Sequence, residues 1–280
     1  MKKELIKQFQ NDGFFTIESL FNVEEIEALK KACLAPEDTE WKTSQKSIHS
    51  LEITCRSHLI FDLARDPRLV EILTMLMGPD IQLQHSKLAA QPMHAGRGGF
   101  GWHQDFAFFP HTNTNLIAIM VHLDDHTPQN GGMSFLKGSH RFGLLNHNNA
   151  DGMFTAHCQE KSLWENHPEN IVSLNLPAGS ISIHHCLTLH GSGPNQNGKP
   201  RRGIVFQYKA SDAFQLADKV FEDTGLQISG QPSKVVRCEQ GALLLPKRNP
   251  GVEKFGIAWH QMGSFAAKMN ESKNLEVQIS

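Results

Sequence analysis

The apolar positions of the first eighty residues follow helical and short strand-like patterns in turn. Residues 4–12 predict a short helix, residues 13–17 a strand, and residues 22–33 an amphipathic helix with acidic residues in its first turn. Residues 58–78 hold two more helical stretches, which Asp66-Pro67 separates. From about residue 81 the pattern changes to strands and turns. The chain is therefore expected to be mainly β with flanking helices, packed on a double-stranded β-helix, a jelly-roll (cupin-like) barrel.

One domain is expected for the whole chain. No internal repeat or low-complexity linker divides the 280 residues, of which 39% are hydrophobic, and all-β barrels of this size are routinely one domain. We predict a helical part over about 1–80, a jelly-roll core over about 81–210 and a chain-specific elaboration over about 211–280. Residues 146–170 are rich in Asn and His and too long for a simple turn, so they are a candidate active-site lid.

One predicted strand carries three histidines. It covers residues 180–190, after a turn at residues 177–179, and its alternation and β-branched content are typical of a strand. The face expected to look into the barrel mouth holds Ser180, Ser182, His184, Cys186, Thr188 and His190. His190 ends the strand, where a metal near the open end would sit, and is the preferred ligand. His184 is a candidate for orienting a ligand, and His185 is expected to be structural.

A His-x-Asp pair lies in Trp102-His103-Gln104-Asp105, after a Gly-rich stretch and beside several phenylalanines. Such a pair with one distant histidine is the 2-His-1-carboxylate ligand set of non-haem iron(II) oxygenases. Side chains at positions i and i+2 of a strand share one face, so His103 and Asp105 can bind one metal. His190 would supply the third ligand.

A second His-x-Asp pair, His122-Leu123-Asp124, has a different interpretation. It is followed by Asp125-His126-Thr127-Pro128 and Asn130-Gly131-Gly132, which are turn-forming sequences. We interpret this pair as the end of a strand that runs into a polar turn.

Arg201 follows His190 by eleven residues, after a turn rich in Gly, Pro and Asn, and begins the next predicted strand. A hairpin of this length would return the guanidinium to the metal site, where its planar fork matches a carboxylate. Alternation puts Arg202 on the opposite face, as a surface cation. Ser192 is placed to donate its hydroxyl to the same carboxylate.

Several of these motifs, taken in order, resemble the phytanoyl-CoA dioxygenase family. The matching runs are Gly101 to Phe106, Leu123 to Met133, Gly138 to Arg141, Pro177 to Ser180, and His190 to Gly193 followed by Arg201. The resemblance covers roughly residues 10–210, and the joint occurrence is far more specific than any one motif. It implies an iron(II)- and 2-oxoglutarate-dependent dioxygenase, which uses O2 to hydroxylate a small-molecule metabolite while 2-oxoglutarate is oxidatively decarboxylated to succinate and CO2.

The resemblance also assigns residues. Those matched to the family's iron ligands are His103, Asp105 and His190. Those matched to its 2-oxoglutarate-binding residues are Arg201, Ser192 and, upstream, Lys46. The strand around His85, Lys87 and Gln91 should also line the pocket, whereas Val121 stands where relatives often have a tryptophan. Related halogenases replace the carboxylate with a small residue, so Asp105 favours hydroxylation.

Composition restricts the partners. A net charge of −2 gives no electrostatic footprint for nucleic acid, and no apolar run approaches the length of a membrane helix. The N-terminus has no apolar core of a signal peptide, and five cysteines without CxxC spacing indicate reduced thiols in a cytoplasmic protein. A small-molecule substrate is therefore expected.

Two other functions stay open at this point. A metal-binding cupin that acts as an isomerase or hydrolase would use the same three ligands but leaves Arg201 without a purpose. A non-catalytic ligand-binding relative would have no reason to keep all three ligands. The substrate itself is not specified, because relatives act on acyl-CoA thioesters, secondary metabolites, osmolytes and phosphonates, and a shared fold cannot choose among them.

Overall fold

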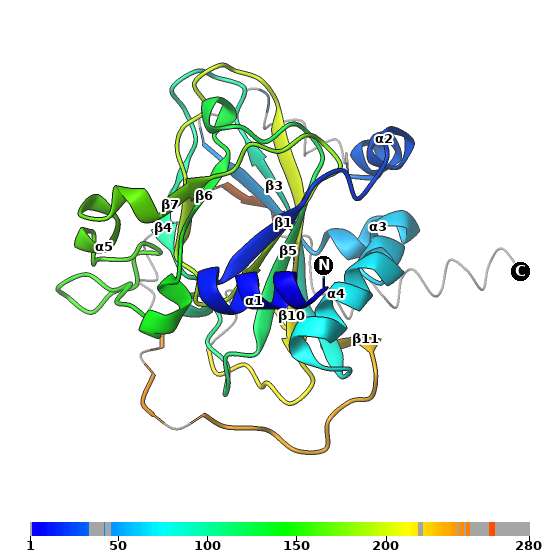
Figure 1. Cartoon of the computed structure of the whole chain (residues 1–280), viewed down its shortest axis with the longest axis vertical. Helices are drawn as coiled ribbons and strands as arrows, with labels where there is room; N and C mark the ends of the chain where they lie inside the picture. Colours follow the sequence, from blue (N-terminus) through cyan, green and yellow to red (C-terminus); the bar gives the residue numbers. More distant parts are fainter. Residues whose placement is uncertain are drawn as a thin grey trace, which may run out of the picture.

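The computed structural model describes residues 2–33, 42, 46–217, 221–239, 241–243, 245–246 and 258–260. Two sheets face each other, and helices cover the outer side of the larger one (Figure 1). The larger sheet has the order β1-β8-β5-β10-β3-β2-β12, with β11 also paired to β3, and the smaller has the order β4-β9-β6-β7. All the pairings except β12 with β2 are antiparallel. The predicted jelly-roll architecture is confirmed, as a sandwich that is not fully closed.

The element bounds are as follows. The α-helices are α1 Lys2–Asp12, α2 Val23–Ala32, α3 His58–Leu63, α4 Pro67–Met77 and α5 Ser162–Glu165. The strands are β1 Phe14–Ile17, β2 Ile48–Leu51, β3 Ile81–Gln91, β4 Phe100–His103, β5 Leu116–His122, β6 Met133–Leu136, β7 Ile171–Ser173, β8 Ile181–His185, β9 His190–Ser192, β10 Arg201–Ala210, β11 Leu226–Ser229 and β12 Ala258–His260. Short 3-10 helices are η2 Ile53–Cys55, η3 Asp105–Ala107, η4 Pro128–Asn130, η5 Ser139–Phe142 and η6 Pro168–Asn170.

The helices predicted before residue 80 are confirmed, and their ends are capped. Asn22 and Glu25 form a capping box at the start of α2, in which each side chain accepts the other residue's backbone N–H. Asp66 caps α4, whose first residue is Pro67, so the predicted break between α3 and α4 lies at a proline with no N–H to lose. None of the helices in the described part of the chain combines the length and apolar character needed to span a bilayer.

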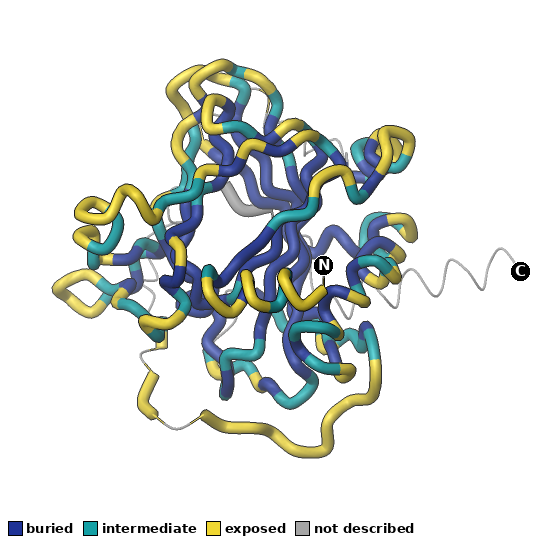
Figure 2. Tube along the Cα trace, in the orientation of Figure 1, coloured by how far each residue is buried: buried dark blue, intermediate teal, exposed yellow. Residues whose placement is uncertain are grey.

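Alternation along β10 divides the protein into a core and a site. Ile204, Phe206 and Tyr208 pack with the helices in the main apolar cluster. The intervening residues Val205 and Gln207 face the space between the sheets. Figure 2 shows the central strands of the larger sheet, β3, β5 and β10, buried along almost their whole length, whereas the helices carry exposed residues.

A β-bulge changes the direction of side chains on β3. Gln207 pairs with His85 while Tyr208 pairs with Leu83, so Gln84 is an extra residue in β3. Leu83 therefore packs in the helix-side core, whereas Lys87, four residues on, lines the cavity between the sheets. The bulge gives β3 an apolar start and a polar, cavity-facing end.

The expected strand over residues 180–190 is wrong in its middle. It consists of β8 in the larger sheet and β9 in the smaller sheet, and the chain turns between them. Cys186, expected on the pocket face, is buried in an apolar cluster and its thiol donates to the carbonyl of Thr114. The predicted hairpin to Arg201 is also wrong, because β9 pairs with β4 and β6 while β10 pairs with β3 and β5. Separate sheets thus bring His190 and Arg201 to one cavity from opposite sides.

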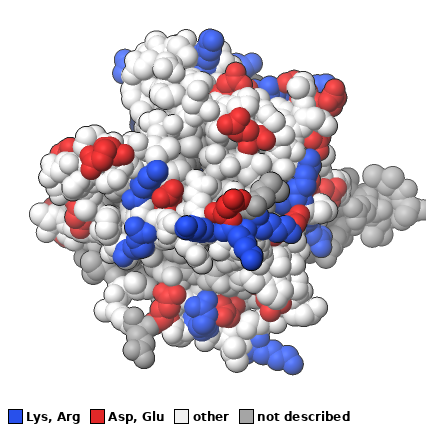
Figure 3. All heavy atoms as spheres, viewed as in Figure 1, with Lys and Arg blue, Asp and Glu red and all other residues white. Residues whose placement is uncertain are grey.

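The segments at the two ends of the chain both reach the larger sheet. The N-terminal part supplies β1 and β2 as well as helices, and the C-terminal part supplies β11 and β12. The side chain of Trp259 and all of Phe265, which belong to the predicted elaboration over 211–280, lie outside the described residues. On the face shown in Figure 3, acidic and basic side chains are intermixed.

Candidate active site

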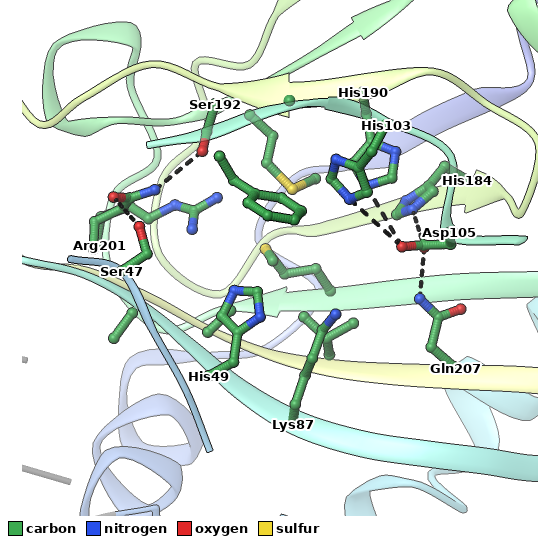
Figure 4. A pocket seen from close by; sticks show the side chains of 18 residues that line it. Ser47, His49, Lys87, His103, Asp105, His184, His190, Ser192, Arg201 and Gln207 are labelled. Atoms are coloured by element: carbon green, nitrogen blue, oxygen red, sulfur yellow. Dashed lines mark hydrogen bonds and ion pairs between the residues drawn. The ribbon is translucent and has the colours of Figure 1, made fainter. Parts of the chain in front are cut away.

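Three potential metal ligands meet in the cavity between the sheets. His103 ends β4, Asp105 begins η3 and His190 begins β9. Nε2 of each histidine lies 3.8 Å from Oδ1 of Asp105, and all three side chains are almost completely buried (Figure 4). The expectation that one strand carries His103 and Asp105 is wrong, because β4 ends at His103. The 3-10 turn after it still directs Asp105 to the same point.

Hydrogen bonds on the far side of each ring fix which nitrogen faces the cavity. Nδ1 of His103 donates to the carbonyl of Gly101, and Nδ1 of His190 donates to the carbonyl of Thr188, both over 2.9 Å. Burial lowers the pKa of His190 to about 4 and holds the pKa of His103 well below its ordinary value, so both rings are neutral. Each Nε2 therefore presents a lone pair toward the Asp105 carboxylate. These three atoms are all electron-rich and have no proton between them, so they repel one another unless a cation lies among them. The ligand set therefore fits a divalent metal ion.

The second oxygen of Asp105 is held by two donors. Nε2 of His184 donates to Oδ2 over 3.0 Å, and the amide Nε2 of Gln207 donates to the same atom over 2.6 Å. Burial opposes ionisation of Asp105, but the hydrogen bond from His184 and the charge of Lys87 act against it, and the pKa of Asp105 lies well below its usual range. Oδ1 thus remains directed at the histidines. The orienting role predicted for His184 matches this contact.

Arg201 lies in the same cavity, at the start of β10. It is 4% exposed, and its Nε donates to Nε2 of His126 over 3.1 Å. No carboxylate forms an ion pair with Arg201 within the part of the chain that the structure describes. Burial lowers the pKa of Arg201 to about 9, which still leaves the guanidinium charged at neutral pH. A buried cation of this kind calls for an anionic ligand.

Polar side chains surround the Arg201 end of the cavity. Gln91, which pairs with Arg201 across β3 and β10, donates from Nε2 to the hydroxyl of Ser192 over 3.0 Å. Its Oε1 accepts from the hydroxyl of Ser47 and the backbone N–H of Gly99. Ser192 is thereby placed in the same cavity as Arg201, as the sequence predicted.

Lys46 does not join this group. Its side chain is exposed and does not line the cavity, whereas its neighbour Ser47 and also His49 do. The expectation that Val121 shapes the wall of the cavity is wrong, because Val121 packs in the helix-side core; its neighbour Met120 lines the cavity. The full lining is Ser47, His49, Lys87, Ala89, Ala90, Gln91, Phe100, His103, Asp105, Met120, Met133, His184, His190, Gly191, Ser192, Arg201, Val205 and Gln207.

Sequence reasoning missed two residues that support the site. Gln207 stands six residues after Arg201, so strand alternation was a signal that it shares the cavity face. His126 gave no such signal, because it follows β5 in a turn. The second His-x-Asp pair is confirmed as a strand end: Asp124 accepts from the backbone and guanidinium of Arg202, at distances of 2.8–3.0 Å.

The segment over residues 146–170 packs beside the site. The backbone N–H of Gln104 donates to Nε2 of His147 over 3.0 Å, and the ring of His157 lies 5.6 Å from that of Phe100. His147 is buried rather than at the surface. The segment therefore supports the turn that carries Asp105, and its role as a lid stays a prediction.

The family model for phytanoyl-CoA dioxygenase (PhyH) matches residues 9–203. A probable alpha-ketoglutarate-dependent hypophosphite dioxygenase of Stutzerimonas stutzeri is 30% identical, with 88% of this chain and 92% of the relative covered. The ectoine dioxygenase of Sphingopyxis alaskensis is 26% identical over 88% of this chain and 86% of its own.

Solved structures are similar to this chain as well. EctD from S. alaskensis with 2-oxoglutarate and 5-hydroxyectoine has a TM-score of 0.62 and 25% identity, covering 89% of this chain and 88% of its own. The carbocyclase SnoK, at 20% identity over 76% of this chain and 86% of its own, has a TM-score of 0.64 and shares the fold. The relatives' substrates, such as ectoine, are small molecules. This chain belongs to the phytanoyl-CoA dioxygenase family and is an iron(II)- and 2-oxoglutarate-dependent dioxygenase.

Proposed function

We propose that His103, Asp105 and His190 hold the iron(II) and that the enzyme hydroxylates a small, polar molecule. The observation that carries this assignment is the convergence of two neutral Nε2 atoms on one carboxylate oxygen, 3.8 Å from each. When bound, the iron supplies the oxygen chemistry that couples decarboxylation of 2-oxoglutarate to substrate hydroxylation. The protein's part is to bind and orient the reactants and to exclude side reactions.

Arg201 and Ser192 are proposed to bind the carboxylate of 2-oxoglutarate that lies away from the iron. The guanidinium is buried without a carboxylate partner among the described residues, and the Ser192 hydroxyl lies in the same cavity. Gln91 supports both positions because it pairs with Arg201 and donates to Ser192. For Lys46, whose side chain is exposed, a contact with the co-substrate stays a prediction.

The walls near the iron ligands favour a small substrate. Apolar contacts come from Phe100, Met120, Met133 and Val205. The relatives named above act on hypophosphite and ectoine, so we propose these two compounds as the first candidates.

We also propose that the described residues form one catalytic domain. The five cysteines, none of them in a CxxC spacing, support a reducing, cytoplasmic location.

The test is turnover of the purified enzyme with iron(II), 2-oxoglutarate and oxygen, with succinate measured by mass spectrometry. Either hypophosphite or ectoine should raise succinate release above the rate without substrate. The Asp105→Ala variant should lose this release, whereas His167→Ala, at an exposed surface histidine, should keep it. Equal succinate release by the wild type and Asp105→Ala would refute the ligand assignment.

A further inference from the structure

Lys87 is a buried cation that the proposed function does not use. It lies near the middle of β3, is 9% exposed, and its ammonium points into the cavity (Figure 4). No hydrogen bond or ion pair joins Lys87 to any other residue in the described ranges; the ring of Phe221 lies beside it, with its centroid 5.4 Å from Nζ. By contrast, the buried Lys209 is paired with Asp223 over 2.7 Å and with the carbonyl of Ala213.

Asp105 is the nearest negative charge that acts on Lys87, but among the described residues it forms no ion pair with it. Its Oδ2 already accepts from His184 and Gln207, and its Oδ1 faces His103 and His190. Once a divalent ion is bound, the charge of Asp105 is offset by the metal. A buried ammonium with no counter-ion is costly, so the cavity is built to receive a negative charge beside Lys87.

The charges in the cavity with iron(II) and 2-oxoglutarate bound also favour an anionic substrate. Among the lining residues, Lys87 and Arg201 are cations and Asp105 is an anion. Iron(II) adds two positive charges and 2-oxoglutarate adds two negative charges. One positive charge remains, which a substrate with a single negative charge would neutralise.

Lys87 and Arg201 lie at different positions along the paired strands β3 and β10. Arg201 pairs with Gln91, whereas Lys87, four residues away on β3, pairs with Val205. Four residues of strand span about 13 Å. The two carboxylates of 2-oxoglutarate are already assigned, one to Arg201 and the other to the iron, so Lys87 is left for a third anionic group.

The surroundings of Lys87 suit a small anion. His49 lines the same cavity, and burial holds its pKa well below the ordinary value, so its imidazole is neutral. The ring of Phe221, which lies beside Lys87, stacks on His85 with centroids 4.2 Å apart. We infer that Lys87, with His49 beside it, recognises the negatively charged group of a small monoanionic substrate such as a carboxylate or an oxyanion of phosphorus. This inference rests on the proposed function, since it assumes that iron and 2-oxoglutarate occupy their assigned sites.

The experiment is anaerobic calorimetric titration of the protein loaded with iron(II) and 2-oxoglutarate. The probes are formate, acetate and phosphite, with formamide and acetamide as uncharged counterparts of the first two. The wild type should bind at least one of the three anions, and it should bind formate and acetate at least 10-fold more tightly than their matched amides wherever those anions bind. Amides that bind as tightly as the anions, or no binding by any of the three anions, would overturn the inference.

Variants locate the effect. Lys87→Met should weaken anion binding by about 10- to 100-fold, the range for loss of a hydrogen bond to a charged group. Lys87→Arg should retain most of it, and Lys137→Met, which removes the same charge from an exposed position, should match the wild type. Unchanged anion binding in Lys87→Met would contradict the inference.

Two further readouts distinguish substrate recognition by Lys87 from a role in co-substrate binding or in the fold. The affinity of Lys87→Met for 2-oxoglutarate should stay within about threefold of the wild type; a loss there, with anion binding kept, would assign Lys87 to the co-substrate. A wild-type protein that binds no 2-oxoglutarate would refute the proposed function instead. The metal-free Lys87→Met protein should melt at a higher temperature than the wild type, because an uncompensated buried charge is removed, whereas a structural lysine would give the opposite shift.

Discussion

Nε of Arg201 donates a hydrogen bond to Nε2 of His126 over 3.1 Å, and this contact fixes the protons of a buried histidine pair. Since Nε2 of His126 accepts, its Nδ1 carries the proton and donates to Nδ1 of His122 over 2.9 Å. Nε2 of His122 then donates to the hydroxyl of Ser182 over 3.2 Å. Burial and the Arg201 charge keep the pKa of His126 well below its ordinary value, so it stays a neutral acceptor. The terminal nitrogens of Arg201 are left for a ligand.

Replacing His126 should therefore weaken 2-oxoglutarate binding without affecting iron. His126→Leu removes the acceptor that orients the guanidinium, and we expect about a 10-fold rise in the 2-oxoglutarate dissociation constant. Anaerobic calorimetry measures it, with His167→Leu at an exposed site as the control. A wild-type affinity in His126→Leu would show that Arg201 needs no support from this histidine.

Neighbouring arginines on β10 should give opposite results. Arg201→Ala should raise the 2-oxoglutarate concentration needed for half-maximal turnover by about 100-fold, because a bidentate, charged contact is lost. Arg202→Ala should instead lower the free energy of unfolding by about 1–2 kcal/mol, since Arg202 pairs with Asp124 away from the cavity, and leave the 2-oxoglutarate requirement unchanged. Turnover assays and urea denaturation distinguish them. The same 2-oxoglutarate defect in both variants would contradict the assignment.

Gln207 should matter for the metal although it is not a ligand. Gln207→Leu removes the amide that donates to Asp105 over 2.6 Å, and partners of metal ligands typically contribute about 10- to 100-fold in affinity. Competition with a coloured chelator measures iron(II) affinity. Gln82→Leu, which breaks a hydrogen bond to Gln227 outside the cavity, is the matched control. Equal iron affinities for these two variants would remove Gln207 from the site.

The sequence predicted the chemistry better than the paths of the strands. His103, Asp105, His190 and Arg201 could be chosen because each matches a ligand type and a family motif. The end of the strand at His185 could not be predicted, because the alternation of the two faces continues through Cys186 and Leu187. These two residues leave the sheet to pack in an apolar cluster, which is formed by residues distant in the sequence. The bulge at Gln84 is likewise a matter of register between β3 and β10, which no local pattern encodes.

Stability should fall as the pH is lowered below 6.5. Burial lowers the pKa of His111 and His147 to about 4 and that of His122 to about 3. The unfolded chain binds protons at these residues near pH 6.5 and the folded chain does not, so acid favours unfolding. Each histidine should lower the free energy of unfolding by about 1 kcal/mol when the pH falls from 7.5 to 5.5. Urea denaturation of the metal-free protein at both values measures this, and equal stabilities would contradict the burial of these rings.

The most direct test of the central claim is anaerobic titration of the metal-free protein with iron(II) and 2-oxoglutarate, followed by visible absorption. A 2-oxoglutarate molecule that chelates iron gives a weak metal-to-ligand charge-transfer band. We expect the band in the wild type and in His167→Ala, and its loss in His103→Ala and Asp105→Ala. Iron binding without the band, or a band that survives in both ligand variants, would contradict a 2-oxoglutarate-binding iron site at His103, Asp105 and His190.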